Sequence, residues 1–518
     1  MSVGTTRVYS FDIGTKTIEV AFFNEATRKV ELLDINEGGK DDQAKKILPS
    51  VIAFSLKDKS FTYGRDAELK EGNEGYVLIH DIKRYLLCRW ESQDKQDNIL
   101  VNKGGWVAYK LGDSVYTTEQ LYNSLIGHVI EKCIRCGHSI GRVVVTVPNN
   151  FGDEQRRLVK KIFTERLSIT DDCCSVVVEP TAAIMGLEDK MVKNPTAVFD
   201  YGGGTLDISI ATITKNNGID VNDIMSHEDK VTGGTDIDKA IYEHLVQMIN
   251  DEDVEVESGS DDDLSKLKKH IAGNIGKNQL MKFSEELKIN MGMDPKIFTA
   301  KRVKYRFNID EKDIEEWITH LIDEAVESMV NANEDFKKKH NSSIGSIVLV
   351  GGTSQIPLVM KKMKEKFPDV VVTLHPQPLF AVASGAALYK KKEKSVKEVS
   401  SYPVSLVMAD TRLGMRVTES IIPKNEPLPT TKRYTIKFVS NGQREVDLEF
   451  YKQEGNKLPL SSMKLGKVTA QIHGGVKKGQ EATLVVTMDT EGCITFTFEY
   501  KIGHMNATAT VRWENRAV

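Results

Sequence analysis

The stretch Val198–Ser209, VFDYGGGTLDIS, combines acidic, glycine and hydroxyl residues at a spacing suited to phosphate chemistry. An apolar run ends in Asp200, three glycines and Thr205 follow, and Asp207 precedes a second apolar run. Apolar runs on both sides of a tight glycine turn predict a β-hairpin, and glycines let backbone N–H groups approach an anion closely. Because carboxylates repel a bare phosphate, Asp200 and Asp207 favour a hydrated Mg²⁺ between them and the phosphate. The alternative is a glycine-rich hairpin whose acids are only solvated.

A second segment near the N-terminus repeats this pattern. Tyr9–Thr17, YSFDIGTKT, has an apolar run that ends in Asp12, followed by Gly14 and Thr15. Two such hairpins in two halves of the chain predict a duplicated fold that binds a Mg-nucleotide in a cleft between the halves. A third segment, Ile347–Pro357 (IVLVGGTSQIP), is an apolar strand that runs into a double-glycine turn. A strand of this kind at the start of a helix is suited to holding a sugar or base.

Composition limits the classes of function. The chain has 518 residues, 40% of them hydrophobic and 28% charged, with a formal net charge of −4, which argues against general binding to nucleic acid. No apolar run approaches the roughly 18–20 residues that span a bilayer, and the N-terminus lacks a secretory apolar segment. Six cysteines do not make a disulfide framework. We therefore expect a cytoplasmic protein of two to four domains that binds neither nucleic acid nor membrane.

Elements around the hairpins carry further candidate residues. Val176–Met185 predicts a strand followed by a helix, with Glu179 at the carboxyl end of the strand, where α/β folds place functional groups. The alternative for Glu179 is an acid that stabilises the helix start through the dipole. Asp81–Trp90 predicts a helix with Lys83 near its start, and a solvated surface lysine is the alternative there. Gly233 and Gly234 precede a helix with acids in its first turn.

The pattern changes near residue 390. Pro376–Tyr389 contains AVASGAALY, a run of small residues that allows a helix to pack closely. Residues 390–401 are charged and polar, and after them the hydrophobic period shifts from 3.6 to 2, in short strands separated by Asn-Gly, Gly-Gly and Glu-Gly turns. We expect an N-terminal nucleotide-binding domain over 1–389, a linker over 390–401 and a β-sandwich over 402–518.

The order of motifs along the chain resembles the 70-kDa heat-shock chaperone family. The motifs are DIGT, VPNNFGDEQR, VEPTAAIMGL, DYGGGTLDIS, GGTDID and VLVGGTSQIP, and a β-sandwich follows them. The resemblance implies an α/β, actin-like, two-lobed ATPase domain with a duplicated ribonuclease-H-like fold, followed by an all-β domain that grips extended polypeptide. It implies ATP or ADP with Mg²⁺ as cofactors, with K⁺ as a further candidate ion. The implied partners are unfolded polypeptide segments, with J-domain co-chaperones and nucleotide-exchange factors as further candidates.

The resemblance also implies roles for single residues. Asp12 and Asp207 would hold Mg²⁺ through water, and Pro148 with Arg156 would relay the nucleotide state to the second domain. The implied catalytic residues are Lys83, Glu179, Asp200 and Thr205. The implied nucleotide-binding residues are Gly14, Thr15, Lys16, Gly203, Gly204, Thr205, Gly233, Gly234, Glu285, Lys288, Gly351, Gly352 and Gln355. Five apolar side chains are candidates for the peptide groove, although alternation predicts an ordinary sandwich core equally well: Leu406, Met408, Tyr434, Val446 and Leu448.

Several positions depart from the family pattern. Lys16 follows DxGT where a small or aromatic residue is usual, and it either adds a cation near the phosphates or points away. Ile289 and Gln355 occupy positions where arginines usually sandwich the adenine. The linker lacks the usual acidic, leucine-rich character, and the sequence ends at Val518 without the expected helical lid. An absent lid and a sequence cut short both fit that ending.

Two functions follow from these observations. The first is an ATP-hydrolysing chaperone that binds unfolded polypeptide, favoured by the complete set of Asp12, Lys83, Glu179, Asp200 and Asp207. The second is a slow or non-hydrolysing ATP-binding co-chaperone or nucleotide-exchange partner of a standard chaperone, favoured by the altered adenine contacts and linker.

Overall fold

The structure is a computed structural model of the chain. It describes residues 7–88, 90, 99–188, 191–215, 219–228, 233–257, 262–292, 294, 296–392, 399–400, 402–410, 415–455, 457–459, 464–473, 475–503 and 505–514. In this part of the chain, no helix is both long and apolar enough to cross a membrane.

The first half of the chain is built on a mixed sheet with the order β12-β11-β1-β2-β3. Its strands are β1 (Val8–Ile13), β2 (Thr17–Asn24), β3 (Lys29–Leu32), β11 (Arg142–Val147) and β12 (Cys174–Val178), and β4 (Leu48–Pro49) also pairs with β2. β1 pairs antiparallel with β2 and parallel with β11. The central strands are almost continuously apolar because both faces of the sheet are covered.

The second sheet, β15-β14-β13-β19-β20, has the same strand order and the same directions of pairing. Its strands are β13 (Thr196–Tyr201), β14 (Leu206–Lys215), β15 (Ile219–Glu228), β19 (Ser346–Val350) and β20 (Val371–Leu374). In both sheets the turn between the first two strands carries a glycine corner of the sequence. We call the part with β1–β12 lobe I and the part with β13–β20 lobe II.

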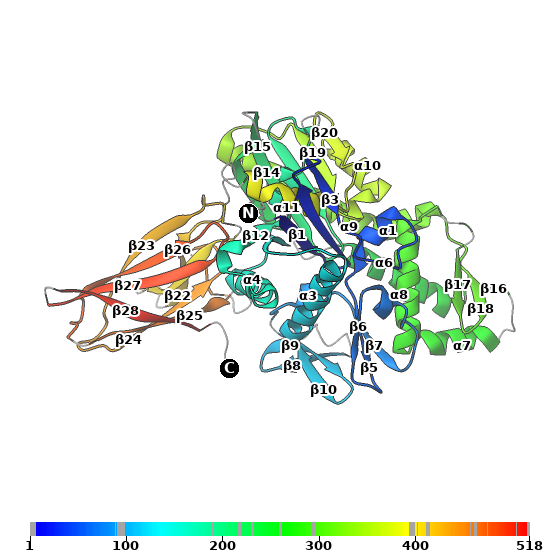
Figure 1. Cartoon of the computed structure of the whole chain (residues 1–518), viewed down its shortest axis with the longest axis horizontal. Coiled ribbons are helices and arrows are strands. Elements are labelled where there is room, and N and C mark those ends of the chain that lie inside the picture. The colour runs from blue at the N-terminus through cyan, green and yellow to red at the C-terminus, as the bar shows by residue number, and fades with distance from the viewer. Residues whose placement is uncertain are drawn as a thin grey trace.

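Helices surround and separate the two sheets (Figure 1). Those of lobe I are α1 (Asp42–Lys46), α2 (Arg65–Glu68), α3 (Thr118–Arg135), α4 (Asp153–Leu167) and α5 (Glu179–Met185). Those that follow are α6 (Gly234–Asn250), α7 (Asp262–Ile271), α8 (Asn274–Ile289), α9 (Glu311–His340), α10 (Pro357–Lys366) and α11 (Ala381–Lys392). One buried apolar cluster joins strands of both sheets through α5 and α11. These two helices therefore fix the position of one lobe on the other.

Three small sheets extend the lobes. Their strands are β5 (Ile52–Ser55), β6 (Phe61–Tyr63), β7 (Tyr76–Ile79); β8 (Leu100–Lys103), β9 (Trp106–Leu111), β10 (Ser114–Thr117); and β16 (Glu255–Val256), β17 (Ile297–Ala300), β18 (Val303–Arg306). The expected helix over Asp81–Trp90 is only a short 3₁₀ helix, η1 (Ile82–Tyr85), so that part of the sequence expectation was wrong. Two further 3₁₀ turns are η3 (Asp171–Cys173) and η5 (Thr353–Gln355).

The C-terminal unit is an antiparallel β-structure with the order β22-β21-β24-β25-β28-β27-β26-β23. Its strands are β21 (Val404–Asp410), β22 (Met415–Ile422), β23 (Thr430–Lys437), β24 (Glu445–Tyr451), β25 (Lys464–Gln471), β26 (Glu481–Met488), β27 (Ile494–Ile502) and β28 (Met505–Glu514). β28 pairs with β25 on one side and with β27 on the other, and a single apolar core lies inside. In Figure 1 this unit extends to the left and meets the rest of the molecule beside α4.

The junction between the two parts is described only at its edges. α11 continues to Lys392, three residues past the expected end of the first domain, and most of the expected linker, 393–398 and 401, lies outside the described residues. Val399 forms an isolated antiparallel bridge with Pro427. The domain boundaries stay a prediction.

Candidate functional site

The two glycine corners touch each other, although they lie far apart in the sequence. A Cβ atom added to Gly204 in lobe II would stand 2.4 Å from Oγ1 of Thr15 in lobe I. A Cβ added to Gly233 would stand 2.5 Å from the carbonyl carbon of Gly204, so the start of α6 packs on the same turn. Glycine at these positions is what allows three backbone segments to approach this closely.

Buried acids gather below this contact. Asp12 is the penultimate residue of β1, Asp200 and Asp207 are paired on β13 and β14, and Glu179 begins α5. All four are less than a tenth exposed. Burial, followed by the charge of Glu179, raises the pKa of Asp12 to about 6, and burial with the charges of Glu179, Asp207 and Asp12 raises the pKa of Asp200. This mutual influence shows that carboxylates from both lobes occupy one site.

Lys83 is the buried cation of this cluster. It lies in η1, is 3% exposed, and its Nζ donates to Oε1 of Glu179 at 2.6 Å. Burial alone would lower the pKa of Lys83, but the carboxylates of Glu179 and Asp12 outweigh burial and raise it. The lysine is therefore a permanent positive charge, and Glu179 holds it in place.

One residue of this cluster was missed in the sequence. Glu19 on β2 lies opposite Asp12 in the β1–β2 register and is 2% exposed, and among the described residues its Oε1 has no hydrogen-bond partner. Burial, followed by the charge of Asp12, raises the pKa of Glu19 well above its ordinary value. The available signal was a single charged residue inside the otherwise apolar strand segment TIEVAFF.

The charge balance of the cluster fits a bound divalent cation. Asp12, Glu19, Glu179, Asp200 and Asp207 supply five carboxylates, and Lys83 supplies one buried positive charge. Buried carboxylates left without compensating charge are costly, and oxygen ligands of this kind are those that Mg²⁺ takes in proteins. The donor set therefore suits Mg²⁺, as expected from the sequence.

Two polar residues of β11 and the turn after it orient the acids. Thr146 donates to Oδ1 of Asp12 at 2.8 Å, and the backbone N–H of Asn149 donates to Oδ1 of Asp207 at 2.9 Å. Neither residue was singled out from the sequence. Asn149 lies inside the quoted VPNNFGDEQR segment, but only the fold brings it against Asp207.

The remaining glycine positions border the same site. Gly351 has φ +83°, and a Cβ there would stand 2.7 Å from Oδ1 of Asp200. Nζ of Lys288 lies 2.6 Å from Oδ1 of Asp238 and donates to the carbonyl of Gly234 at 3.2 Å. Arg84 of lobe I pairs with Asp236 of lobe II at 3.1 Å. The residues expected to bind phosphate and sugar therefore lie next to one another, and Asp236 and Asp238 are further members of the site.

The expected adenine side is more open. Glu285 is half-buried, Gln355 is exposed, and Ile289 is 67% exposed at the end of α8. Thr205 is half-buried. Gly14 lies close to the backbone of its own turn, because an added Cβ would stand 2.5 Å from the carbonyl oxygen of Thr17. The roles of these residues in nucleotide binding stay predictions.

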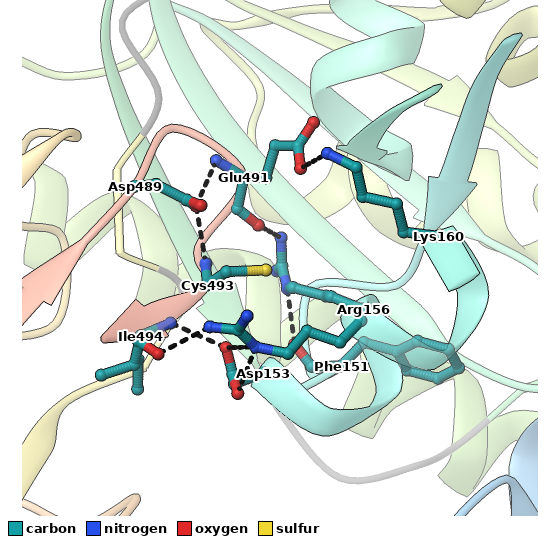
Figure 2. A network of polar contacts seen from close by, with 9 residues as sticks. Phe151, Asp153, Arg156, Lys160, Asp489, Glu491, Cys493 and Ile494 are labelled. Atoms are coloured by element: carbon teal, nitrogen blue, oxygen red, sulfur yellow. Dashed lines mark hydrogen bonds and ion pairs between the residues drawn. The ribbon is translucent and has the colours of Figure 1, made fainter. Parts of the chain in front are cut away.

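The sandwich contacts lobe I along α4 (Figure 2). Nη1 of Arg156 donates to the carbonyl of Glu491 at 2.9 Å, and Lys160 pairs with the Glu491 carboxylate at 2.7 Å. The N–H of Ile494 donates to Oδ1 of Asp153 at 2.7 Å. Asp489, Glu491 and Cys493 bring side-chain ligand atoms within 4.8 Å of one another, but Asp489 accepts from the backbone of the turn and Glu491 is paired with Lys160.

Hydrogen bonds, together with the backbone of residues 148–151, connect this contact to the acids. The segment that holds Asp207 through Asn149 continues from Pro148, whose carbonyl accepts from Phe151 at 3.1 Å. The carbonyl of Phe151 accepts from Nε of Arg156 at 2.8 Å. Pro148 and Arg156 thus lie between the cluster and the sandwich, and the relay itself stays a prediction.

The five candidate groove residues all adjoin the sandwich core. Leu406, Val446 and Leu448 are buried members of it, whereas Met408 and Tyr434 are half-buried against it. This burial favours the core alternative for the first three, and a role in peptide binding stays a prediction for the set.

Comparisons with known proteins agree with this architecture. The family model described as "Hsp70 protein" matches residues 8–517. Similar curated proteins are the "Chaperone protein DnaK" of Nitrosopumilus maritimus, 28% identical over 86% of this chain, and the "Heat shock cognate HSP70 protein" of Trypanosoma brucei brucei, 26% identical over 92%. A further one is the "Chaperone protein DnaK" of Anaplasma marginale, 25% identical over 90%. The alignments cover 66%, 72% and 70% of these relatives' own lengths, so the chain spans about two thirds of them.

Proposed function

Because the chain belongs to the Hsp70 protein family, we propose that it is an ATP-dependent molecular chaperone that hydrolyses ATP and binds exposed hydrophobic segments of unfolded proteins. The observation that carries the proposal is the buried cluster of carboxylates around Lys83, built by both lobes directly below two touching glycine corners. The fold proposed for 1–389 is the actin-like, duplicated ribonuclease-H-like domain, supported by the identical strand order of the two sheets.

The residues of the cluster divide the work of hydrolysis. Asp12 and Asp207 would hold Mg²⁺ through water, and the ion would offset the negative charge of the phosphates. Backbone N–H groups of the two glycine corners bind the phosphates, and Lys83 adds a fixed positive charge where negative charge develops in the transition state. Glu179 orients Lys83, and Asp200 with Thr205 orders the attacking water. The sandwich, proposed over 402–518, holds extended polypeptide through backbone hydrogen bonds.

A second candidate is a slow or non-hydrolysing co-chaperone or nucleotide-exchange partner of a standard 70-kDa chaperone. The observation that favours it is the open adenine side, with Gln355 exposed and Ile289 largely exposed. J-domain proteins and exchange factors are proposed partners under the first candidate only.

Steady-state ATP hydrolysis, measured with and without an unfolded peptide, separates the two candidates. Under the first, the protein turns over ATP and Lys83→Met lowers the rate about 10²- to 10³-fold while fluorescent ADP still binds. ADP binding without turnover in either form moves the assignment to the second candidate. Turnover unchanged by Lys83→Met contradicts the catalytic role of Lys83, and the exposed Lys161→Met serves as the control.

A further inference from the structure

Lys16 reaches from lobe I onto the glycine corner of lobe II. It follows Thr15 in the turn between β1 and β2, and its carbonyl accepts from the N–H of Ser50 at 2.8 Å, which anchors its backbone in lobe I. A Cβ atom added to Gly203 would stand 2.5 Å from Cγ of Lys16. The aliphatic stem of Lys16 therefore lies directly on Gly203, where the proposed function places phosphate.

The ammonium group of Lys16 stands between carboxylates of the two lobes. Its Nζ is 3.6 Å from Oδ1 of Asp81 in lobe I and 4.0 Å from Oδ2 of Asp238 in lobe II. Asp238 is 1% exposed, and its other oxygen lies 2.6 Å from Lys288. Burial alone would lower the pKa of Lys16, but Asp81, Glu285 and Asp238 outweigh burial and raise it. Lys16 is thus a full positive charge in this setting.

The ion pairs of Lys16 are longer than the ion pair of the neighbouring Lys288. Lys288 lies 2.6 Å from Asp238, whereas the two ion pairs of Lys16 measure 3.6 Å and 4.0 Å, and the Lys16 side chain keeps 27% exposure. An ammonium at such distances retains hydrogen-bonding capacity for a stronger acceptor. A phosphate oxygen carries the charge and lone pairs that such a donor needs.

We propose that Lys16 exchanges partners: it bridges the lobes through Asp238 in the nucleotide-free protein, and a di- or triphosphate takes over its ammonium group. This inference rests on the proposed nucleotide site. Lys16 would then do two things. It would make the site prefer phosphorylated over unphosphorylated nucleoside, and it would restrain the glycine corner at Gly203 before a nucleotide binds.

Calorimetric titration of the full chain with MgADP and with adenosine tests the first property. We expect Lys16→Met to weaken ADP binding about 10- to 100-fold, because a hydrogen bond between charged groups is lost, and to change adenosine affinity less than twofold. Lys16→Arg restores part of the ADP affinity. Lys132→Met is the matched control. Lys132 is also a partly buried lysine of lobe I, and its Nζ lies 3.6 Å from the carboxylate of the exposed Glu37.

Hydrogen exchange of the Gly202–Thr205 amides in the nucleotide-free protein tests the second property. We expect exchange several-fold faster in Lys16→Met than in the unaltered chain, because the stem and the bridge no longer restrain the corner. Unchanged exchange overturns the bridge. Equal weakening of ADP and adenosine, or no weakening of either, overturns the phosphate contact while leaving the nucleotide site intact. If the unaltered protein binds no nucleotide, the proposed function fails and this inference fails with it.

Discussion

Among the acids of the cluster, Glu19 has the effect on the free energy of unfolding that is easiest to measure. It is buried, and its Oε1 has no hydrogen-bond partner in the part of the chain that the structure describes. Asp12 and Glu179 act on it with negative charge, and Lys83 acts on it with positive charge. A carboxyl whose pKa is raised by burial and by neighbouring negative charge keeps its proton to a higher pH in the folded state than in the unfolded chain. The folded protein therefore binds more protons than the unfolded chain above pH 4.5, and the contribution of Glu19 to stability falls as pH rises.

We predict that Glu19→Gln raises the free energy of unfolding near pH 8 by about 1–3 kcal/mol, because at this pH the Glu19 carboxyl must either take up a proton or bury its charge on folding, and the neutral amide does neither. Near pH 5, where Glu19 is protonated in the folded protein, the gain is smaller. Urea unfolding at both pH values, without nucleotide and with a chelator present, measures this difference. The exposed Glu131→Gln is the control, and an equal gain at both pH values would contradict the assignment.

At the scale of elements, the contact of α5 with α11 determines where Glu179 stands. Gly385 of α11 lies so close to α5 that an added Cβ would stand 1.7 Å from the carbonyl oxygen of Ala182. The hydroxyl of Ser10 on β1 donates to the carbonyl of Ala383, which ties α11 to the first sheet as well. The close packing expected from AVASGAALY is confirmed by this contact.

We predict that Gly385→Ala destabilises the protein by about 1–3 kcal/mol or more, because the two helices have to move apart to admit a methyl group. ATP turnover falls with it, since α5 carries Glu179. Thermal unfolding and the hydrolysis assay measure the two effects. Gly292→Ala is the matched control, because a Cβ there meets nothing within 4 Å; equal stability of the two variants would show that α5 and α11 are not rigidly packed.

At the scale of the whole molecule, the polar contacts between the sandwich and lobe I include several on α4. Lys160 and Glu491 form the ion pair of this contact, and both side chains are about a fifth exposed. A partly exposed pair contributes modestly, so the contact is suited to forming and separating.

We predict that Lys160→Glu shifts the ratio of docked to undocked molecules about 5- to 10-fold toward undocked, because like charges then face each other. Combining it with Glu491→Lys restores docking. Distances between spin labels on α3 and β26 measure the populations. Lys161→Glu is the matched control, since the ion pair of Lys161 with Glu165 lies within α4. If the variant with both Lys160→Glu and Glu491→Lys did not restore docking, the pair would not be what holds the domains together.

Local pattern was sufficient for the parts of this protein that depend on local chemistry. The glycine corners after Asp12 and Asp200, the strand-to-helix start at Glu179 and the change of period near residue 390 are each set by a few adjacent residues, because turns and pleats are short-range structures. The family followed from the order of these motifs, and the match over 8–517 confirms it. The alternation of apolar and polar residues predicted the strands of the sandwich, but it did not distinguish residues of a peptide groove from residues of the core.

Tertiary structure decided which residues of different motifs meet. Glu19 was not singled out from the sequence, because only the pairing of β1 with β2 places it opposite Asp12. Asn149 became part of the site only through its contact with Asp207. Lys16 was left between two orientations, and its place between Asp81 and Asp238 depends on how closely the two lobes approach. These contacts join residues distant in sequence, and their energies depend on burial and on neighbouring charge, neither of which exists before the chain is folded.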